Sequence, residues 1–79
     1  MTTHDPQMIK GVLGLLLLQL LDEGDGYGYG IVTRLQENGF EDLAEGTVYP
    51  ALARLEAAGH LDSYLLRSAA GPARKYYRI

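Results

Sequence analysis

Ten consecutive residues near the start of the chain, Val12 to Leu21, are aliphatic except for Gly14 and Gln19. A helix that crosses a bilayer needs about 20 apolar residues, so this segment is too short to span one. It is apolar nearly all round, which indicates a helix buried on every side. Any fold available to this chain must therefore supply enough other elements to surround it.

A secretory signal peptide is the alternative for this segment, because Lys10 precedes an apolar stretch of suitable length. The flanking residues argue against it. Asp5 lies in the preceding segment, and Asp22 and Glu23 follow directly without a small-residue cleavage site. We therefore expect a core helix in a cytoplasmic protein that has no membrane partner.

The chain is short, with 79 residues and no cysteine. A domain of this size buries only about 60% of the surface of its unfolded chain. Neither a disulfide nor a thiolate metal site can add stability, so tight packing or a partner subunit must supply it. A hydrophobic content of 47% excludes a disordered chain. We expect one folded domain that gains stability from a partner subunit.

Helix, strand and turn signals divide this single domain, residues 1–79, into five elements. The predicted helices cover about residues 6–22, 27–38 and 46–58, and the predicted strands cover about 61–67 and 74–79. Asp5 and Pro6 provide a helix start, and Gly59 suits a left-handed C-cap for the third helix. Pro50 is expected in the first turn of that helix, where a missing N–H costs little. Three helices followed by a small antiparallel hairpin predict a mainly α, winged helix-turn-helix fold.

Two glycines, Gly28 and Gly30, lie early in the second predicted helix. Each lowers the intrinsic helix propensity by about 1 kcal/mol. Because glycine lets two backbones approach closely, we expect the first two helices to pack tightly at this point.

The third predicted helix has two faces that differ in composition. At about 100° per residue, one face is an apolar stripe made by Val48, Leu52 and Leu55, with Ala51 and Ala58 at its sides. The opposite face has small side chains at its centre and polar ones at its edges: Pro50, Ala53 and Ala57, then Tyr49 on one side and Thr47 and Arg54 on the other. Small side chains allow close approach in a DNA major groove, while hydroxyl and guanidinium groups reach bases or phosphates.

Other roles for this face stay open at the level of sequence. The small side chains would equally suit a second apolar surface, such as a subunit interface. Arg54 would serve a structural role if it paired with Glu41, Asp42 or Glu45.

Positive charge is concentrated in the last third of the chain. The net charge is −3, but residues 1–53 carry two basic and eight acidic side chains (−6), and residues 54–79 carry five basic and two acidic ones (+3). Arg74 and Lys75 lie on the returning strand, beside a Ser68–Gly71 tip that can follow a phosphate line or enter a minor groove. A basic edge hairpin that only prevents aggregation is the alternative.

Signals for enzymatic chemistry are absent from the sequence. His4 and His60 are the only histidines, there is no cysteine, and no spacing suits a metal site. The glycines at 24, 26, 28 and 30 alternate without a preceding strand, so they do not fit a dinucleotide-binding turn. We expect a non-enzymatic protein without a metal or a cofactor.

Three blocks of the sequence resemble the PadR family of transcriptional regulators. The most specific block reads GTVYPAL over Gly46–Leu52 and continues with Arg54-Leu55-Glu56, Gly59 and Leu61. The others are the Lys10-Gly11 start with the Tyr27–Gly30 run, and the GPARKYY segment over residues 71–77. The resemblance extends from about residue 9 to residue 79.

The resemblance implies a repressor that binds an operator in double-stranded DNA, usually as a homodimer, and that a small aromatic effector often releases. It implies that the third helix, through Thr47, Tyr49 and Pro50, and the wing, through Arg74 and Lys75, meet the operator. With Arg54 from the helix face, these residues form the predicted DNA-binding surface. The alternative, favoured by the overall acidity, is a winged-helix protein-interaction module that does not bind DNA.

The sequence departs from the family pattern in two places. Gly30 stands where the family usually has glutamate, and the sequence stops at Ile79, where family members continue into a C-terminal helical region. That region builds the dimer and much of the effector site in the family, so we expect further residues to follow in the intact protein.

Overall fold

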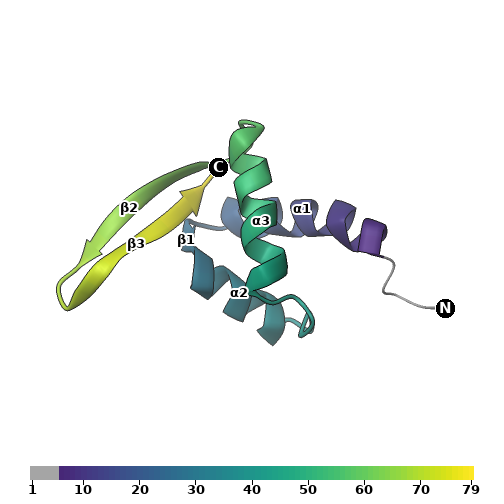
Figure 1. The fold of residues 1–79 in the computed structure, drawn as a ribbon, viewed down its shortest axis with the longest axis horizontal. Coiled ribbons are helices and arrows are strands. Elements are labelled where there is room, and N and C mark those ends of the chain that lie inside the picture. Colours follow the sequence, from purple (N-terminus) through teal and green to yellow (C-terminus); the bar gives the residue numbers. More distant parts are fainter. Residues whose placement is uncertain (1–5) are drawn as a thin grey trace.

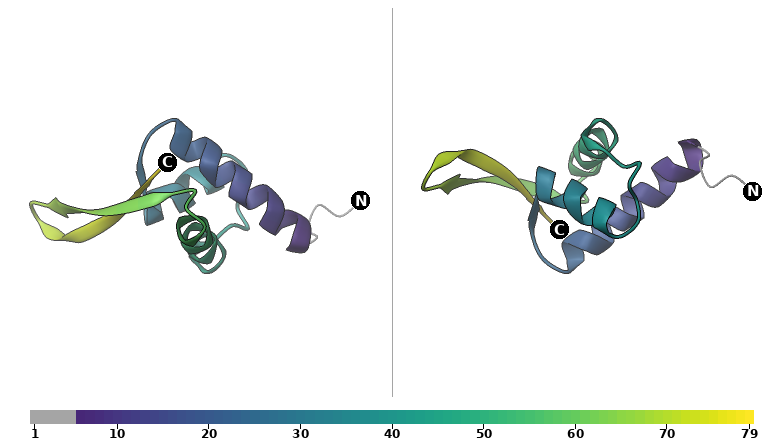
Figure 2. Two further views of the ribbon diagram at one scale, coloured as in Figure 1. Left: turned by 90° about the horizontal axis from the view of Figure 1, so that it is seen from above. Right: turned by 90° about the horizontal axis from the view of Figure 1, so that it is seen from below.

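The computed structural model describes residues 6–79 and the side chains of residues 11–79. Its helices are α1 (Pro6–Asp22), α2 (Gly28–Glu37) and α3 (Glu45–Ala57), and its strands are β1 (Gly26–Tyr27), β2 (Asp62–Ser68) and β3 (Gly71–Arg78). The three helices pack together, and the β2–β3 hairpin projects from them as a wing (Figure 1). Both views in Figure 2 show this wing on the side opposite to the start of α1. The architecture confirms the predicted winged helix-turn-helix. The predicted cap Asp5 and His4 lie outside the described residues.

The core is built on one face of α1. Leu13, Leu17 and Leu21 recur every four residues, so they align on one side of the helix, and each is at most 4% exposed. They pack with apolar side chains from α2, α3, β3 and two connecting segments: Ile31, Val32, Leu35, Leu43, Val48, Ala51, Leu52, Leu61 and Tyr77. Burial of each large aliphatic side chain contributes about 1.5–3 kcal/mol to folding.

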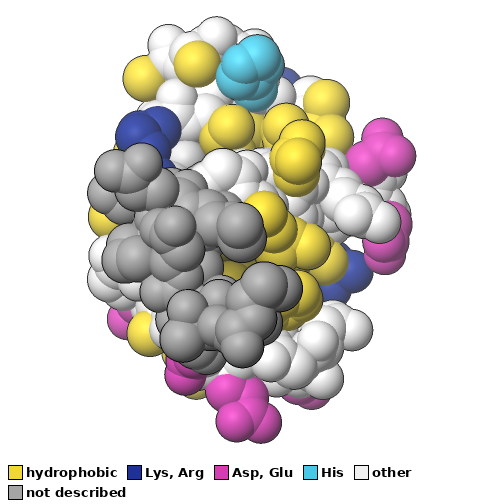
Figure 3. Space-filling view, turned by 90° about the vertical axis from the view of Figure 1, so that its right-hand side faces the viewer, with side chains coloured by type: hydrophobic (Ala, Val, Ile, Leu, Met, Phe, Trp, Pro, Cys, Tyr) yellow, Lys and Arg dark blue, Asp and Glu magenta, His cyan; other side chains and the backbone are white. Residues whose placement is uncertain are grey.

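The prediction that α1 is buried on every side is wrong. Val12 is 45% exposed and Leu15 is 69% exposed, so one face of the helix is uncovered. Only α2, α3 and a narrow sheet are available to cover α1, which is too little to surround it. Figure 3 shows hydrophobic side chains gathered on the side of the molecule where α1 starts. Within residues 6–79, no helix is long and apolar enough to cross a membrane.

The start of α3 differs from the prediction, and its C-terminal cap agrees with it. The helix begins at Glu45, so Pro50 lies in its second turn rather than its first. The missing N–H leaves the carbonyl of Gly46 without its usual helical donor, and the exposure of Gly46 lets water take that place. At the other end Gly59 has φ +84°, which confirms the left-handed cap, and the His60 N–H donates to the Leu55 carbonyl at 2.9 Å.

The sheet has three strands instead of the two expected. The sequence predicts that the second helix begins at residue 27, but Tyr27 lies in β1 and α2 begins one residue later. β1 pairs with β3 through Gly26 opposite Tyr77 and Tyr27 opposite Tyr76, and the strand order is β1-β3-β2. This short strand joins the base of the wing to the start of α2.

The wing is longer than predicted. β3 begins at Gly71 rather than residue 74, so the turn between β2 and β3 contains only Ala69 and Ala70. Leu66 pairs with Arg74 and Ser68 with Gly71, a one-residue shift that places an extra residue on β3 beside Pro72. Proline is tolerated at such a bulge because no ladder hydrogen bond needs its nitrogen.

Candidate nucleic-acid interface

The outward face of α3 is exposed as the helical periodicity predicts. Its side chains Thr47, Pro50, Ala53, Arg54 and Ala57 are all exposed, while Val48 and Leu52 are fully buried. The buried stripe is shorter than predicted, because Leu55 is only half-buried and Ala58 is exposed. The first three turns of α3 therefore anchor the helix in the core and present a small-residue face outward.

Arg54 makes no ion pair with any other described side chain. The structural alternative, a salt bridge from Arg54 to Glu41, Asp42 or Glu45, is therefore not present among residues 11–79. Its guanidinium keeps all five N–H donors available to an external acceptor.

Tyr49, Arg74 and Lys75 come together around one hollow of about 360 Å³. The hollow lies where the start of α2, the first turns of α3 and the β3 strand meet, and its other lining residues are Tyr27, Gly28, Tyr29 and Tyr77. Thr47, Pro50 and Arg54 do not line it. The six predicted site residues thus form two groups: a helix face, and a tyrosine-lined hollow with two cations.

The ring of Tyr49 occupies space that Gly28 leaves open because it has no side chain. A Cβ atom added to Gly28 would lie 2.9 Å from Cε1 of the Tyr49 ring, closer than real side chains approach. The close contact expected at this glycine is therefore made with α3 and not with α1. Burial, together with the nearby Glu45 carboxylate, raises the pKa of the Tyr49 hydroxyl.

The two cations of the hollow have different neighbours. The guanidinium of Arg74 lies 4.9 Å from the centre of the Tyr27 ring. The ammonium of Lys75 donates to Glu56 of α3 at 3.3 Å and lies 5.3 Å from the centre of the Tyr77 ring. Arg74 therefore contacts a ring and pairs with no acidic side chain among residues 11–79, whereas Lys75 is paired with Glu56.

The arrangement of helices and wing has a counterpart among known proteins. The family model of the transcriptional regulator PadR-like family matches residues 17–79. This match includes α2, α3 and the whole wing. The chain belongs to the PadR-like family.

Relatives of this PadR-like chain match it over most of its length. An uncharacterized protein X from Lysinibacillus sphaericus is 36% identical over 75 residues, which are 91% of this chain and 68% of that protein. The crystal structure of a PadR-like transcriptional regulator from Bacillus cereus is 40% identical, with a TM-score of 0.81, and the match covers 92% of this chain and 71% of that one. These similarities identify a domain of a transcriptional regulator and not of an enzyme.

The PadR protein of Bacillus subtilis, whose crystal structure is a complex with operator DNA, shares the fold. It is 24% identical, with a TM-score of 0.75, and the match covers 86% of this chain and 40% of that protein. A protein with the same fold as this PadR-like chain has therefore been crystallised with operator DNA.

Sequence reasoning missed two residues of the PadR-like hollow, Tyr27 and Tyr29. Tyr29 is 57% exposed at the start of α2, and Tyr27 is the N-cap residue of that helix. Both belong to the Tyr27–Gly30 run, which marked the family without suggesting a role. Their alternation with small glycines in a predicted helix was the available signal, because it leaves room for other rings beside them.

Proposed function

We propose that this PadR-like domain binds a palindromic operator and acts as a repressor. In this proposal α3 enters the major groove, with Thr47, Tyr49, Pro50 and Arg54 toward the DNA. The wing contacts the backbone or the minor groove through Arg74 and Lys75.

One observation carries the proposal. The exposed face of α3 has small side chains and the guanidinium of Arg54, which pairs with no acid among residues 11–79, and a cationic hairpin projects from the same domain. The wing and its base, residues 62–79, carry four basic side chains and one acidic one. A phosphate backbone attracts such a hairpin, and the small side chains of α3 allow close approach to base edges. The negative charge of residues 1–53 belongs to the rest of the fold and does not decide what this surface binds.

Salt-dependent binding tests the proposal. The protein is titrated onto a fluorescent duplex from its own promoter region and onto a scrambled duplex of the same length. The logarithm of the affinity should fall linearly with the logarithm of salt concentration, with a slope of about 0.9 for each phosphate contacted. Binding that ignores salt, or that does not distinguish the two duplexes, would reject operator recognition.

The α3 contacts are tested by Tyr49→Ala and Arg54→Ala. Each variant should weaken operator binding by about tenfold or more, the effect of losing a charge-assisted or specific polar contact. The melting temperature of each variant separates this effect from misfolding. An equal loss of binding and of melting temperature would assign the residue to the fold instead.

We also propose that the intact protein is a cytoplasmic homodimer. The uncovered apolar face of α1, with Val12 and Leu15, supports a partner subunit because monomers seldom leave adjacent large apolar side chains in water. The matching regulators are longer than this chain, since the match covers 71% of the Bacillus cereus protein. Sedimentation of the intact protein, with and without Leu15→Glu, tests the dimer; an unchanged monomer in both would reject it.

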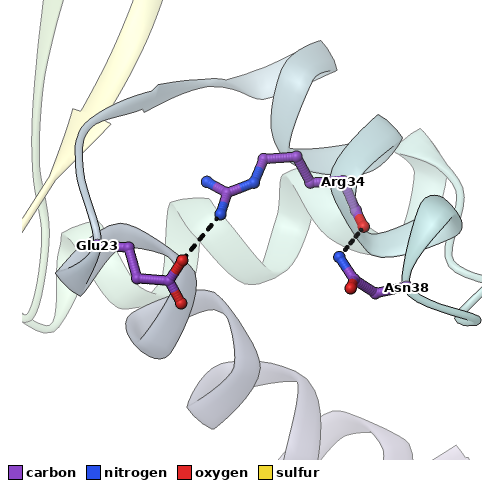
Figure 4. Close-up of polar contacts among 3 residues, drawn as sticks. All are labelled: Glu23, Arg34 and Asn38. Atoms are coloured by element: carbon purple, nitrogen blue, oxygen red, sulfur yellow. Dashed lines mark hydrogen bonds and ion pairs between the residues drawn. The ribbon is translucent and has the colours of Figure 1, made fainter.

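A small aromatic effector completes the proposal. A second hollow of about 400 Å³ lies between α1 and α2, where apolar side chains such as Leu16, Leu20 and Phe40 alternate with polar ones such as Gln19 and Glu23. Arg34 also lines it, paired with Glu23 at 3.2 Å, while the side-chain amide of Asn38 donates to the Arg34 carbonyl (Figure 4). An aromatic acid would pack its ring on the apolar side chains and displace Glu23 from Arg34, so benzoate is a suitable probe. Release of the operator by benzoate from the wild type, but not from Arg34→Leu, would support it; no release would reject this part.

A further inference from the structure

Gly30 leaves space that the ring of Tyr27 fills. A Cβ atom added to Gly30 would lie 2.8 Å from Cε1 and 3.1 Å from Cδ1 of that ring. Tyr27 is the N-cap residue of α2, with an extended backbone of φ −90° and ψ 155°. Its ring therefore lies against the first turn of the helix it caps, at the point where Gly30 has no side chain.

The same ring is held from the wing. The backbone of Tyr27 pairs with Tyr76 of β3, and the two ring centres are 5.6 Å apart. Arg74 lies two residues from Tyr76, on the same face of β3, and its guanidinium lies 4.9 Å from the centre of the Tyr27 ring. The half-buried Tyr27 ring thus contacts Tyr76 and Arg74 from the wing and occupies the space beside Gly30, so displacing it would change its contact with Arg74.

We propose that Gly30 and Tyr27 are positioning residues that hold the Arg74 guanidinium at the DNA interface. The inference rests on the proposed function, because it assumes that Arg74 contacts the operator. A guanidinium on the surface of an extended hairpin would otherwise sample many rotamers and lose that freedom on binding. The Tyr27 ring restricts this freedom in the unbound protein.

Contact with the ring leaves Arg74 able to bind phosphate. A guanidinium packs its flat face on an aromatic ring, while its five N–H donors point outward in the plane of the group. Lys75, by comparison, is already paired with Glu56. Of the two cations of the hollow, Arg74 is therefore the one that a ring restrains and that has no acidic partner among the described side chains.

The test compares Gly30→Ala, Arg74→Ala and the double variant. Gly30→Ala adds one methyl group that displaces the Tyr27 ring, and alanine favours a helix more than glycine does, so loss of folding is not expected. Gly11→Ala is the matched control, because a Cβ added to this α1 glycine meets nothing within 4 Å. Operator affinity is measured across a salt series, and melting temperatures are measured for all variants.

Arg74→Ala should weaken operator binding by about tenfold and reduce the salt slope by about 0.9, the effect of losing one phosphate contact. Gly30→Ala should produce part or all of that loss, and the double variant should bind no more weakly than Arg74→Ala. Gly11→Ala should bind as the wild type does.

NMR of the protein without DNA tests separately whether Tyr27 positions Arg74. The Tyr27 ring current should shift the side-chain proton resonances of Arg74 upfield, and Gly30→Ala or Tyr27→Leu should remove that shift while Tyr27→Phe keeps it. Normal binding by Gly30→Ala beside weak binding by Arg74→Ala would overturn the positioning role alone. Normal binding by Arg74→Ala would show that Arg74 does not contact the operator, and it would reject the part of the proposed function on which this inference rests.

Discussion

The ammonium of Lys75 and a carboxylate oxygen of Glu56 lie 3.3 Å apart, so an ion pair joins the wing to α3. The other carboxylate oxygen of Glu56 accepts a hydrogen bond from the Ser63 hydroxyl of β2. One acid on α3 therefore contacts both strands of the wing. It sets the position of the hairpin relative to the helix, and it also competes with phosphate for the lysine.

We expect Glu56→Gln to bind operator DNA more tightly, by roughly two- to fivefold, the range of an exposed charge interaction. Glutamine keeps the length of the side chain and an acceptor for Ser63, but it removes the charge that holds Lys75 and repels DNA. Fluorescence anisotropy at low and high salt measures the effect. Glu37→Gln, at the last residue of α2, is the control with the same change in net charge. Equal gains in both variants would assign the effect to net charge.

The stability of the fold should depend on the charge of Glu56 in acid. Hydrogen bonds from Ser63 and then Lys75 lower the pKa of this carboxyl below its usual 4.5. Because the pKa is lower in the folded chain, this contribution to stability is complete above about pH 4.5 and is lost as the pH falls through the lowered folded value. Urea unfolding between pH 3 and pH 7 should therefore show a weaker acid dependence for Glu56→Gln. An identical dependence in the two proteins would show that this carboxyl does not contribute.

A methyl group at Gly28 should weaken operator binding through Tyr49. The added Cβ would lie 2.9 Å from the Tyr49 ring, so Gly28→Ala must displace the ring or move α2 away from α3. We expect about a tenfold loss of affinity, comparable to the loss of one specific polar contact. Anisotropy of Gly28→Ala, Tyr49→Ala and the double variant measures whether the losses overlap. Fully additive losses would mean that the two positions act separately.

Gly59 and Gly28 show what the sequence could and could not predict. Helical periodicity identified Val48 and Leu52 as core residues, and the signal at Gly59 located the end of α3, because both depend on near neighbours in the chain. The partner of Gly28 could not be found in this way. Tyr49 is 21 residues away, and only the packing of α2 on α3 brings its ring to the glycine.

The strand β1 was missed for a related reason. Two residues are too few to show an alternating pattern, and Tyr27 becomes a strand residue only because Tyr76, far along the chain, supplies its hydrogen-bonding partner. The pairing that holds the wing to the helices was therefore invisible in local sequence. Arg74 and Lys75 were identified from charge, but their different neighbours, a ring and an acid, followed only from the structure.

The same substitution should destabilise the fold strongly on the buried side of α1 and hardly at all on its exposed side. Leu17 is fully buried, so Leu17→Ala removes apolar contacts and leaves a cavity, and we expect it to reduce the free energy of unfolding by about 2–5 kcal/mol. Leu15 is 69% exposed in the same helix, and Leu15→Ala should change that free energy by less than about 0.5 kcal/mol. Urea unfolding of this chain followed by circular dichroism measures both. The free energy of unfolding of a small domain is only about 5–15 kcal/mol. If Leu17→Ala costs about 5 kcal/mol, a measurable fraction of the variant should be unfolded without urea. A cost for Leu15→Ala as large as that for Leu17→Ala would mean that the exposed face of α1 is already covered in solution, as a dimer would require, and sedimentation of the same samples would then show the larger species.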